Sequence, residues 1–342
     1  MRNNIIALDT NGTLKNWEEA INFYSHWHSE KNTFEITTSG STGSPKTISI
    51  SRKQMIESAR LTIDVLQLSA HDKLLVGLNT QFIGGKMMLV RGFVGEMLMY
   101  ITEPSANPLK NSTISFDFTA VVPMQLETML LDNEADKLNA MKAIIVGGAP
   151  ISQSLQAKIE QLKVPVYATY GMTETVSHIA LKKLNGSDKS SFYSVLGDTT
   201  ITTDERNCLI VEGKVTNNVP IITNDVVELL EKGQFKWLGR YDNIINSGGV
   251  KINPEQIEET ISALLSKLAI HRRFFIHGVD DNFLGKKVVL YIEGKKLNTS
   301  KLVTGFSSLL EKYHQPKDIV FIEYFESTLT GKINRLATLK KL

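Results

Sequence analysis

Short apolar runs alternate with longer amphipathic segments along this chain, and the change of period separates predicted strands from predicted helices. Apolar residues recur at helical spacing in 17–30, 52–68 and 85–100, and Ser51 is the expected cap of the second helix. Short apolar runs that end in turn residues predict strands over 34–40, 120–123, 143–150 and 165–171. This alternation is typical of an α/β protein with buried strands.

The last third of the chain has a different pattern. Two strands are predicted to meet in a hairpin at Lys232 and Gly233, and a helix is predicted to open at Pro254 with Asn253 as its cap. Further strands are predicted over 272–279, 287–294 and 318–325, with a helix over 301–313. We therefore expect an N-terminal α/β domain of residues 1–239 and a smaller α+β domain of residues 240–342.

Composition narrows the class of protein. Of the 342 residues 42% are hydrophobic, which is enough for two folded cores. The 38 basic and 36 acidic residues nearly cancel, and the Lys/Arg pairs are scattered through the sequence. A nucleic-acid partner would favour one basic stripe, so we expect none.

The single cysteine, Cys208, excludes an intrachain disulfide and favours a reducing compartment. The seven histidines show no metal-ligand spacing. The most apolar segment, 84–101, is interrupted by Lys86, Arg91 and Glu96, which argues against membrane insertion, and the N-terminus lacks a signal-peptide core. We expect a cytoplasmic protein.

Residues 37–51, TTSGSTGSPKTISIS, form a polar loop between two predicted strands. A Walker-type phosphate loop needs Gly immediately before its lysine and a helix immediately after it. Here Pro45 precedes Lys46, and the residues that follow alternate between apolar and polar as in a strand. Neither requirement of a Walker-type loop is therefore met. Glycines, hydroxyls and one cation can still wrap an anion, although composition alone leaves an ordinary hairpin loop equally open.

The order of residues in this loop resembles the phosphate loop of the adenylate-forming enzymes, the superfamily of acyl-CoA synthetases, peptide-synthetase adenylation domains and luciferases. Five further motifs of that superfamily follow in order: GGAP (147–150), YGMTET (170–175), TND (223–225), LGRYDNIINSGGVKI (238–252) and TGKINR (330–335). Taken singly, GGAP could be an ordinary turn and YGMTET a strand end. Together they indicate an acid–thiol ligase that uses ATP, Mg²⁺ and CoA.

The resemblance implies a role for each motif. The loop residues that would hold the β- and γ-phosphates are Thr38, Ser39, Gly40, Ser41, Thr42, Gly43 and Lys46. The adenine and ribose contacts would be Gly147, Gly148, Ala149, Pro150, Tyr170, Gly171, Met172, Asp225 and Arg240. Thr173 would approach the phosphate, Glu174 and Thr38 would hold Mg²⁺, and Lys332 would reach the carboxylate and the α-phosphate. Asp242 would be the hinge, with Ser247, Gly248 and Gly249 in the CoA tunnel.

The chemistry requires such groups because a carboxylate and ATP are both anions. Attack on the α-phosphate needs a cation near the reacting oxygens, which Lys332 and Mg²⁺ would supply. The lysine must then leave before CoA enters, so the resemblance implies a small mobile C-terminal domain. Only 37 residues precede Thr38, which implies a large domain of stacked α/β layers with a shortened first subdomain.

Several stretches also resemble the compact bacterial form of the o-succinylbenzoate-CoA ligases of menaquinone biosynthesis. They include GGKMMLVRG (84–92) and YGMTETVSHIALKKLNG (170–186). The retained carboxylate of such an acid needs a cation in an apolar pocket, for which Arg91 is the first candidate and Lys86 the second. The alternative interpretation is that both side chains lie on a solvated helix face. Ser177 and His178, with Gln81 and Gly84, are expected to line the pocket.

Three alternatives stay open at this point. The enzyme could act on another aryl or short acyl acid, it could load a carrier-protein thiol, or the chain could be a non-catalytic adenylate-binding protein. Gln81 stands where many members of the superfamily have a histidine, which puts any role of that ring in doubt. The shortened front also raises the alternative of an acid site completed by a second subunit in a homodimer.

Overall fold

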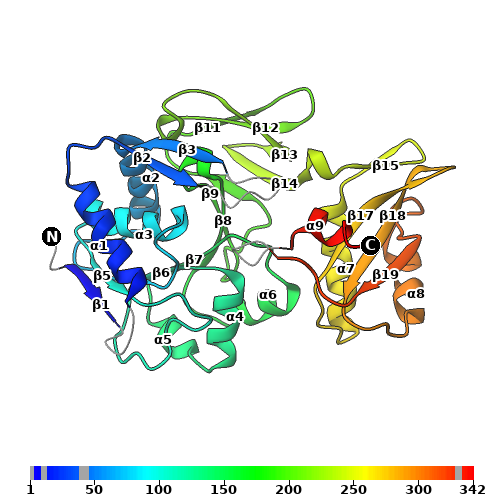
Figure 1. Ribbon diagram of the computed structural model, residues 1–342, viewed down its shortest axis with the longest axis horizontal. Helices are drawn as coiled ribbons and strands as arrows, with labels where there is room; N and C mark the ends of the chain where they lie inside the picture. The colour runs from blue at the N-terminus through cyan, green and yellow to red at the C-terminus, as the bar shows by residue number, and fades with distance from the viewer. Residues whose placement is uncertain (1–3, 9–13, 38–45, 328–332) are drawn as a thin grey trace.

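The computed structural model describes residues 4–8, 14–37, 46–327 and 333–342. Figure 1 shows a larger body, built from the N-terminal two thirds of the chain, beside a smaller one that ends at the C-terminus. Within the described residues each body has its own large sheet, and the change from one sheet to the other falls within 241–244, next to the predicted boundary.

The sheet of the larger body has twelve strands among the described residues. In spatial order they are β1 (Ile5–Ala7), β5 (Leu98–Ile101), β4 (Lys73–Val76), β6 (Phe118–Val121), β7 (Ala143–Val146), β8 (Val166–Gly171), β9 (His178–Lys183), β10 (Tyr193–Val195), β14 (Gln234–Arg240), β13 (Ile221–Leu230), β12 (Cys208–Glu212) and β11 (Thr200–Thr203). From β1 to β8 neighbouring strands are parallel, and from β8 onward they are antiparallel. Cys208 is completely buried in β12.

Helices cover both faces of the parallel part of this sheet (Figure 1). They are α1 (Lys15–Trp27), α2 (Arg52–Val65) and α3 (Ile83–Val94) on one face, and α4 (Pro123–Leu131), α5 (Ala135–Asn139) and α6 (Gln153–Ile159) on the other. Strand β4 shows why two layers are needed, because Leu74 and Val76 enter the core under α1–α3 while Leu75 enters the core under α4–α6. The predicted α/β architecture is confirmed.

Local sequence explains several boundaries. Ser51 caps α2 as expected, since its Oγ accepts from the backbone N–H of Gln54 and the Gln54 side chain accepts from the backbone N–H of Ser51. The predicted hairpin between β13 and β14 is present, with Lys232 and Gly233 both at positive φ.

Other boundaries were predicted wrongly. The helix expected over 85–100 ends at Val94, and Glu96 takes a positive φ of 54° before the chain enters β5. Asn253 stands at the cap position of α7 (Pro254–Lys267), but its side chain makes no capping hydrogen bond. The first helix ends at Trp27 rather than at residue 30, and the helix expected to reach residue 313 ends at Leu309.

The smaller body is an α+β unit. Its strands are β15 (Ile245–Ser247), β16 (Val250–Ile252), β17 (Phe274–Asp281), β18 (Gly285–Glu293) and β19 (Asp318–Ile322), and its other helices are α8 (Ser300–Leu309) and α9 (Arg335–Leu339). Short 3₁₀ turns occur at η2 (Thr173–Thr175), η3 (Lys214–Thr216) and η4 (Tyr241–Asn243). Helix α7 contacts both β17 and β14, so it joins the two bodies.

A separate two-stranded hairpin carries the predicted phosphate loop. Strands β2 (Thr33–Thr37) and β3 (Thr47–Ser51) are antiparallel, and Thr37 is opposite Thr47. In the part of the chain that the structure describes, no helix is both long and apolar enough to span a bilayer.

Candidate active site

The change from parallel to antiparallel pairing brings three aromatic or acidic side chains together. Tyr170, near the end of β8, donates from its hydroxyl to Oδ2 of Asp225 over 2.7 Å. Trp237 on β14 donates from Nε1 to Oδ1 of the same carboxylate over 3.2 Å. Asp225 is only 7% exposed, so both oxygens are held at a fixed place beneath the surface.

Electrostatics favour the neutral form of Tyr170. Burial, followed by the charge of Asp225, raises the pKa of the Tyr170 hydroxyl far above its ordinary value. Nη1 of Arg240 lies 3.8 Å from Oδ1 of Asp225. Burial opposes the Arg240 charge, but its hydrogen bond to Asp242 and the charge of Asp225 outweigh that effect and raise its pKa.

The predicted hinge residue lies between the two sheets. Asp242, in η4, accepts from Nη2 of Arg240 over 2.8 Å and from Nδ2 of Asn224 over 3.1 Å. A few residues later Ser247 is buried, and its Oγ has no hydrogen-bond partner among the described residues. Gly248 and Gly249 follow with φ of 58° and 83°, a conformation that favours glycine.

The GGAP turn follows β7 directly. A Cβ atom on Gly147 would lie 2.2 Å from Oγ1 of Thr169, so only glycine fits against β8 at this point. Gly148 has a φ of 87°, and the turn through Ala149 and Pro150 is exposed. The turn therefore presents backbone to solvent beside the end of β8.

The segment after Tyr170 is sharply bent. Thr173 is half-buried and Glu174 is exposed on η2, while Thr175 is buried and bonds back to Met172. Val176 then takes φ 68° and ψ −58°, a γ-turn closed by the Ser177 N–H on the Thr175 carbonyl over 2.8 Å. A β-branched residue rarely adopts this conformation, and such strain gathers at functional sites.

Beyond this bend lies a buried arginine. Arg91 on α3 is 2% exposed and donates from Nη2 to Oγ of Ser177 over 3.1 Å. Its Nη1 faces only the sulfur of Met88, at 3.8 Å, and its Nε has no partner among the described residues. Burial lowers the pKa of Arg91 to about 9, which leaves the side chain cationic at neutral pH.

His178 lies beside this cation. It is 5% exposed, and its Nε2 is 3.0 Å from Oγ1 of Thr62 on α2. Burial, followed by the charge of Arg91, lowers its pKa well below the ordinary value, so the ring is neutral. The buried Arg91 and His178 thus form one polar cluster with the half-buried Ser177, which is called here the Arg91 cluster.

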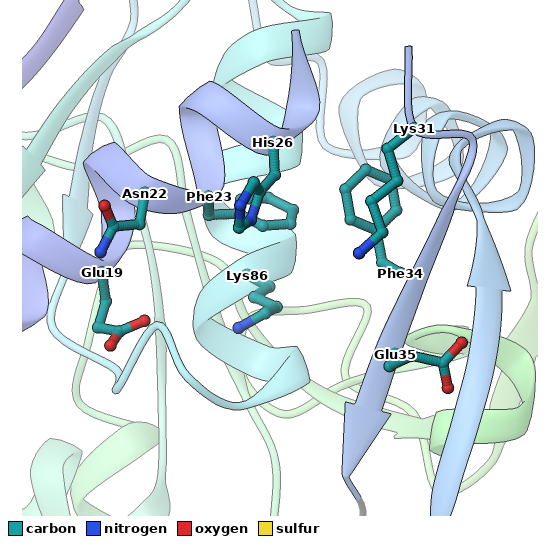
Figure 2. A pocket seen from close by; sticks show the side chains of 8 residues that line it. All are labelled: Glu19, Asn22, Phe23, His26, Lys31, Phe34, Glu35 and Lys86. Atoms are coloured by element: carbon teal, nitrogen blue, oxygen red, sulfur yellow. The ribbon is translucent and has the colours of Figure 1, made fainter. Parts of the chain in front are cut away.

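Lys86, the second candidate, does not join the Arg91 cluster. Its Nζ donates to the carbonyls of Thr80 and Gln81, each over 2.9 Å. Figure 2 shows it reaching from α3 into a pocket between α1 and β2, where its neighbours include Glu19 and Phe23. Burial lowers its pKa and Glu19 partly restores it. Gln81 is exposed and donates to Glu19, and Gly84 lies in the first turn of α3, so neither residue hydrogen-bonds to the Arg91 cluster.

Some predicted residues fall outside the described part of the chain. These are Thr38, Ser39, Gly40, Ser41, Thr42, Gly43 and Lys332. Lys46 is exposed immediately before β3.

The sequence reasoning missed three residues of the site. Trp237 and Thr62 are brought in by neighbouring strands and helices, and no local pattern identifies them. Asn224 stands inside the TND motif and could have been proposed from its position beside Asp225.

A magnesium ion carried by a nucleotide fits the donor set. Over residues 4–8, 14–37, 46–327 and 333–342, no group of three or more His, Cys, Asp or Glu could hold a metal. Glu174 offers one exposed carboxylate. Mg²⁺ commonly takes one or two carboxylates together with substrate phosphates and waters, so one protein ligand is compatible with it.

Comparison with known proteins agrees with this arrangement. Residues 5–205 match the family described as AMP-binding enzyme. The 2-succinylbenzoate–CoA ligase of Geobacillus sp. (strain WCH70) is 26% identical over 351 residues, covering 93% of this chain and 70% of that protein. That of Listeria monocytogenes (strain EGD-e) is 25% identical, with 90% and 70% covered.

Two solved structures are also similar. An acyl-CoA synthetase (AMP-forming)/AMP-acid ligase II-like protein from Dyadobacter fermentans is 41% identical with a TM-score of 0.65, covering 97% of this chain and 96% of its own. The o-succinylbenzoate coenzyme A synthetase of Bacillus subtilis, solved with ATP and magnesium, shares the fold with a TM-score of 0.76 at 22% identity, covering 89% and 69%.

Proposed function

Because this chain belongs to the AMP-binding enzyme family, we propose that it is an acid–CoA ligase that converts o-succinylbenzoate to o-succinylbenzoyl-CoA. The observation that carries the choice of acid is the state of Arg91, a buried cation without a carboxylate partner among the described residues. The names of the Geobacillus and Listeria relatives point to the same acid.

Arg91 favours an acid with two carboxylates. A buried guanidinium without an anion is costly, and a substrate carboxylate that accepts from it would relieve that cost. In o-succinylbenzoate the ring carboxylate would bind Arg91 and Ser177, while the succinyl carboxylate extends toward the nucleotide. The neutral His178 ring adds a polar wall without a competing charge.

The nucleotide would lie across the end of β8. Gly147 to Pro150 would contact the adenine with exposed backbone, and Asp225 would accept hydrogen bonds from the ribose hydroxyls with Arg240 beside it. The Tyr170 ring would offer one face to the adenine while its hydroxyl holds Asp225 in place. Met172 and Gly171 would complete this wall.

The reaction would take two steps in one site. A carboxylate oxygen attacks the α-phosphorus of ATP and pyrophosphate leaves, and the thiol of CoA then attacks the acyl carbon, releasing AMP and a proton. Residues Thr38 to Gly43, with Lys46, would hold the departing phosphates, and Thr173 would donate to the α-phosphate. Lys332 would neutralise charge in the first step only. Mg²⁺, held by Glu174 and Thr38, supplies further charge neutralisation when bound.

The hinge would separate the two steps. Rotation about Asp242 would withdraw Lys332 and bring Ser247, Gly248 and Gly249 toward the thiol of CoA. The Asp242 contacts to Arg240 and Asn224 belong to the orientation described here, and both are exposed, so a rotation can break them without uncovering a core.

The direct test is a substrate panel. The protein is incubated with ATP, Mg²⁺, CoA and each of several acids, and AMP and the CoA thioester are measured. We expect o-succinylbenzoate to exceed benzoate, succinate and short acyl acids by at least about 10²-fold in kcat/KM, because one buried charge pair is worth this much. A different best acid, or transfer only to a carrier-protein thiol, would redirect the assignment within the family. No AMP with any acid would favour a non-catalytic adenylate-binding protein.

A further inference from the structure

Helix α2 carries a stripe of buried polar side chains along one of its faces. Gln54, Ser58 and Thr62 follow one another at intervals of four residues, which places them on the same side of the helix, and all three are buried. Gln54 donates from Nε2 to the carbonyl of Val215 over 2.9 Å. Thr62, two turns further along, contacts His178 instead, so α2 brings one buried hydroxyl to the Arg91 cluster.

The hydroxyl of Thr62 lies between two groups. It donates to the carbonyl of Ser58, one turn earlier, over 3.3 Å, and Nε2 of His178 is 3.0 Å from the same oxygen. A hydroxyl has only one proton to donate, so with this proton on the Ser58 carbonyl the Thr62 oxygen is the acceptor for the ring. In a neutral imidazole the proton then resides on Nε2, and Nδ1 is the unprotonated nitrogen.

The backbone of His178 is fixed independently of Thr62. His178 is the first residue of β9 and is paired with Gly171 at the end of β8. A Cβ atom on Gly171 would lie 2.5 Å from Cα of His178, so the two strands are in close contact at this point. Within the part of the chain that the structure describes, Thr62 is the one hydrogen-bond partner of the His178 ring. The orientation of the ring therefore depends on this hydroxyl.

The orientation matters because the ring lies beside a buried cation. Arg91 donates to Ser177, the residue before His178, and its charge helps to keep the imidazole neutral. With Nε2 bonded to α2, the ring makes no hydrogen bond to Arg91 or Ser177 among the described residues. If the ring lost its partner on α2, its buried N–H would need another acceptor, and the polar groups nearest to it are those of the Arg91 cluster.

We propose that Thr62 is a positioning residue of the acid site, whose hydroxyl holds the His178 ring toward α2 and so keeps Arg91 and Ser177 available to a substrate carboxylate. The inference rests on the proposed function, because it assigns Thr62 to the binding of the acid. Thr62 acts through His178 and does not itself contact the acid. Its loss should therefore weaken binding of the acid without slowing the chemical steps.

The first test compares two substitutions of Thr62 by steady-state kinetics with the acid varied. Thr62→Val removes the hydroxyl and keeps the shape, whereas Thr62→Ser keeps the hydroxyl and removes a methyl group. We expect the KM for the acid to rise by about five- to tenfold in Thr62→Val, the effect of one lost hydrogen bond. Both kcat and the KM for ATP should stay within about twofold, as for a loss of ground-state binding. Thr62→Ser should have the wild-type KM.

The matched control is Thr119→Val. Thr119 on β6 is another fully buried threonine, and its hydroxyl donates to the carbonyl of Leu75 over 2.9 Å, with no hydrogen bond to the Arg91 cluster. This variant should lose stability but keep the KM for the acid. An unchanged or lower KM in Thr62→Val would overturn the proposal. An equal rise in Thr119→Val, or in Thr62→Ser, would overturn it too, since the Thr62 hydroxyl would then have no special part.

A second readout needs no acid. Long-range ¹H–¹⁵N spectra of protein with labelled histidine show which ring nitrogen carries the proton, and His178→Gln identifies the signal among the seven histidines. We expect the Nε2–H form of His178 in wild type and Thr62→Ser, and a population of the Nδ1–H form in Thr62→Val.

The spectra remain decisive if a variant or the assay fails. The Nδ1–H form in wild type would overturn the proposal even if Thr62→Val did not fold, and so would identical His178 signals in wild type and Thr62→Val. If wild type forms no adenylate with any acid, the proposed function fails, whereas the spectra still decide whether Thr62 holds the ring.

Discussion

Arg91 and Ser177, which are 86 positions apart in the sequence, are joined by one hydrogen bond of 3.1 Å between α3 and the segment that follows β8. The bond connects a charged group to a neutral hydroxyl, so it leaves the positive charge of Arg91 uncompensated. The same hydroxyl lies immediately after the strained Val176. A carboxylate that accepted from both side chains would therefore be held between α3 and the turn that follows β8.

Arg91→Met should separate activity from stability. We expect kcat/KM for the acid to fall roughly 10²-fold, because truncating one partner of a buried charge pair costs about 2–5 kcal/mol. The melting temperature should stay the same or rise, since an apolar side chain of similar length replaces a desolvated cation. Steady-state kinetics with varied acid and thermal unfolding measure the two effects. An unchanged KM and kcat for the acid would remove Arg91 from the site.

Lys86→Met is the matched control on the same helix. Its ammonium group bonds two carbonyls and faces the pocket of Figure 2 rather than the Arg91 cluster. We expect kcat/KM for the acid to change by less than about threefold, with lower thermal stability because two carbonyls lose their donor. A large rise in the KM for the acid would mean that the substrate reaches the α1–β2 pocket.

At Val176 we expect a glycine variant to be at least as stable as an alanine variant, whereas glycine is normally the more destabilising of the two. Val176→Ala keeps the positive φ and loses buried methyl groups, whereas Val176→Gly loses more surface but removes strain of about 1–3 kcal/mol. We expect the glycine variant to be no less stable than the alanine variant, as measured by urea unfolding. Because glycine leaves the Ser177 backbone less constrained, its KM for the acid should be the higher of the two. A clearly less stable glycine variant would show that the turn is not strained.

Asp225→Asn tests the ribose contact. The carboxylate accepts from Tyr170 and Trp237, and an amide offers only one oxygen, so one buried donor would lose its partner. We expect the KM for ATP to rise by roughly tenfold or more and the stability of the protein to fall. Tyr170→Phe is the comparison, since it removes one donor but keeps the charge. If both variants bind ATP like wild type, Asp225 serves the fold and not the nucleotide.

The stability of the smaller body should depend on pH through Glu258. Burial, opposed by Arg335 and the Ile276 amide and reinforced by Glu255, raises the pKa of this carboxyl from 4.5 to about 7. Because the folded protein holds the proton more tightly than the unfolded chain, this contribution to stability is full below pH 4.5 and is lost as pH rises through 7. The pKa of His277, the neighbour of Ile276, is lowered by burial and by the charges of Lys286 and Arg335.

Glu258→Gln removes that titration. Its melting temperature relative to wild type should therefore become more favourable as the pH is raised from about 5 to about 8. Differential scanning fluorimetry in buffers of constant ionic strength provides the measurement. A difference that is independent of pH would mean that Glu258 is ionised throughout.

The sequence predicts those parts of the fold whose causes are local. Continuous apolar runs identified β6, β7 and β8, and the Ser51 capping box needs only residues three positions apart. The helix expected over 85–100 was overextended because only Gly95 and Glu96 interrupt the apolar residues between the end of α3 and β5. Gly95 at the C-cap of α3 and Glu96 at positive φ form the turn that separates them, and one glycine inside an apolar segment is a weak signal for a helix end.

In the candidate site, too, the sequence predicts individual residues but not the contacts that depend on packing. Arg91 is conspicuous in the sequence as a cation in an apolar helix, whereas its contact with Ser177 depends on how α3 packs over the sheet. Lys86 and Arg91 look equivalent in the sequence, yet five positions on a helix turn them about 140° apart. The Trp237 contact with Asp225 depends on strand register, which no short pattern encodes.

The burial of Cys208 has a practical consequence for the study of domain rotation. As the sole thiol of the sequence lies inside β12 with no exposed surface, maleimide probes should leave the native chain unlabelled. Two cysteines introduced on the exposed residues Lys236 and Glu259, one on each body, could then carry a donor and an acceptor dye without removal of the native thiol. Single-molecule energy transfer would then test whether the proposed rotation occurs within each turnover.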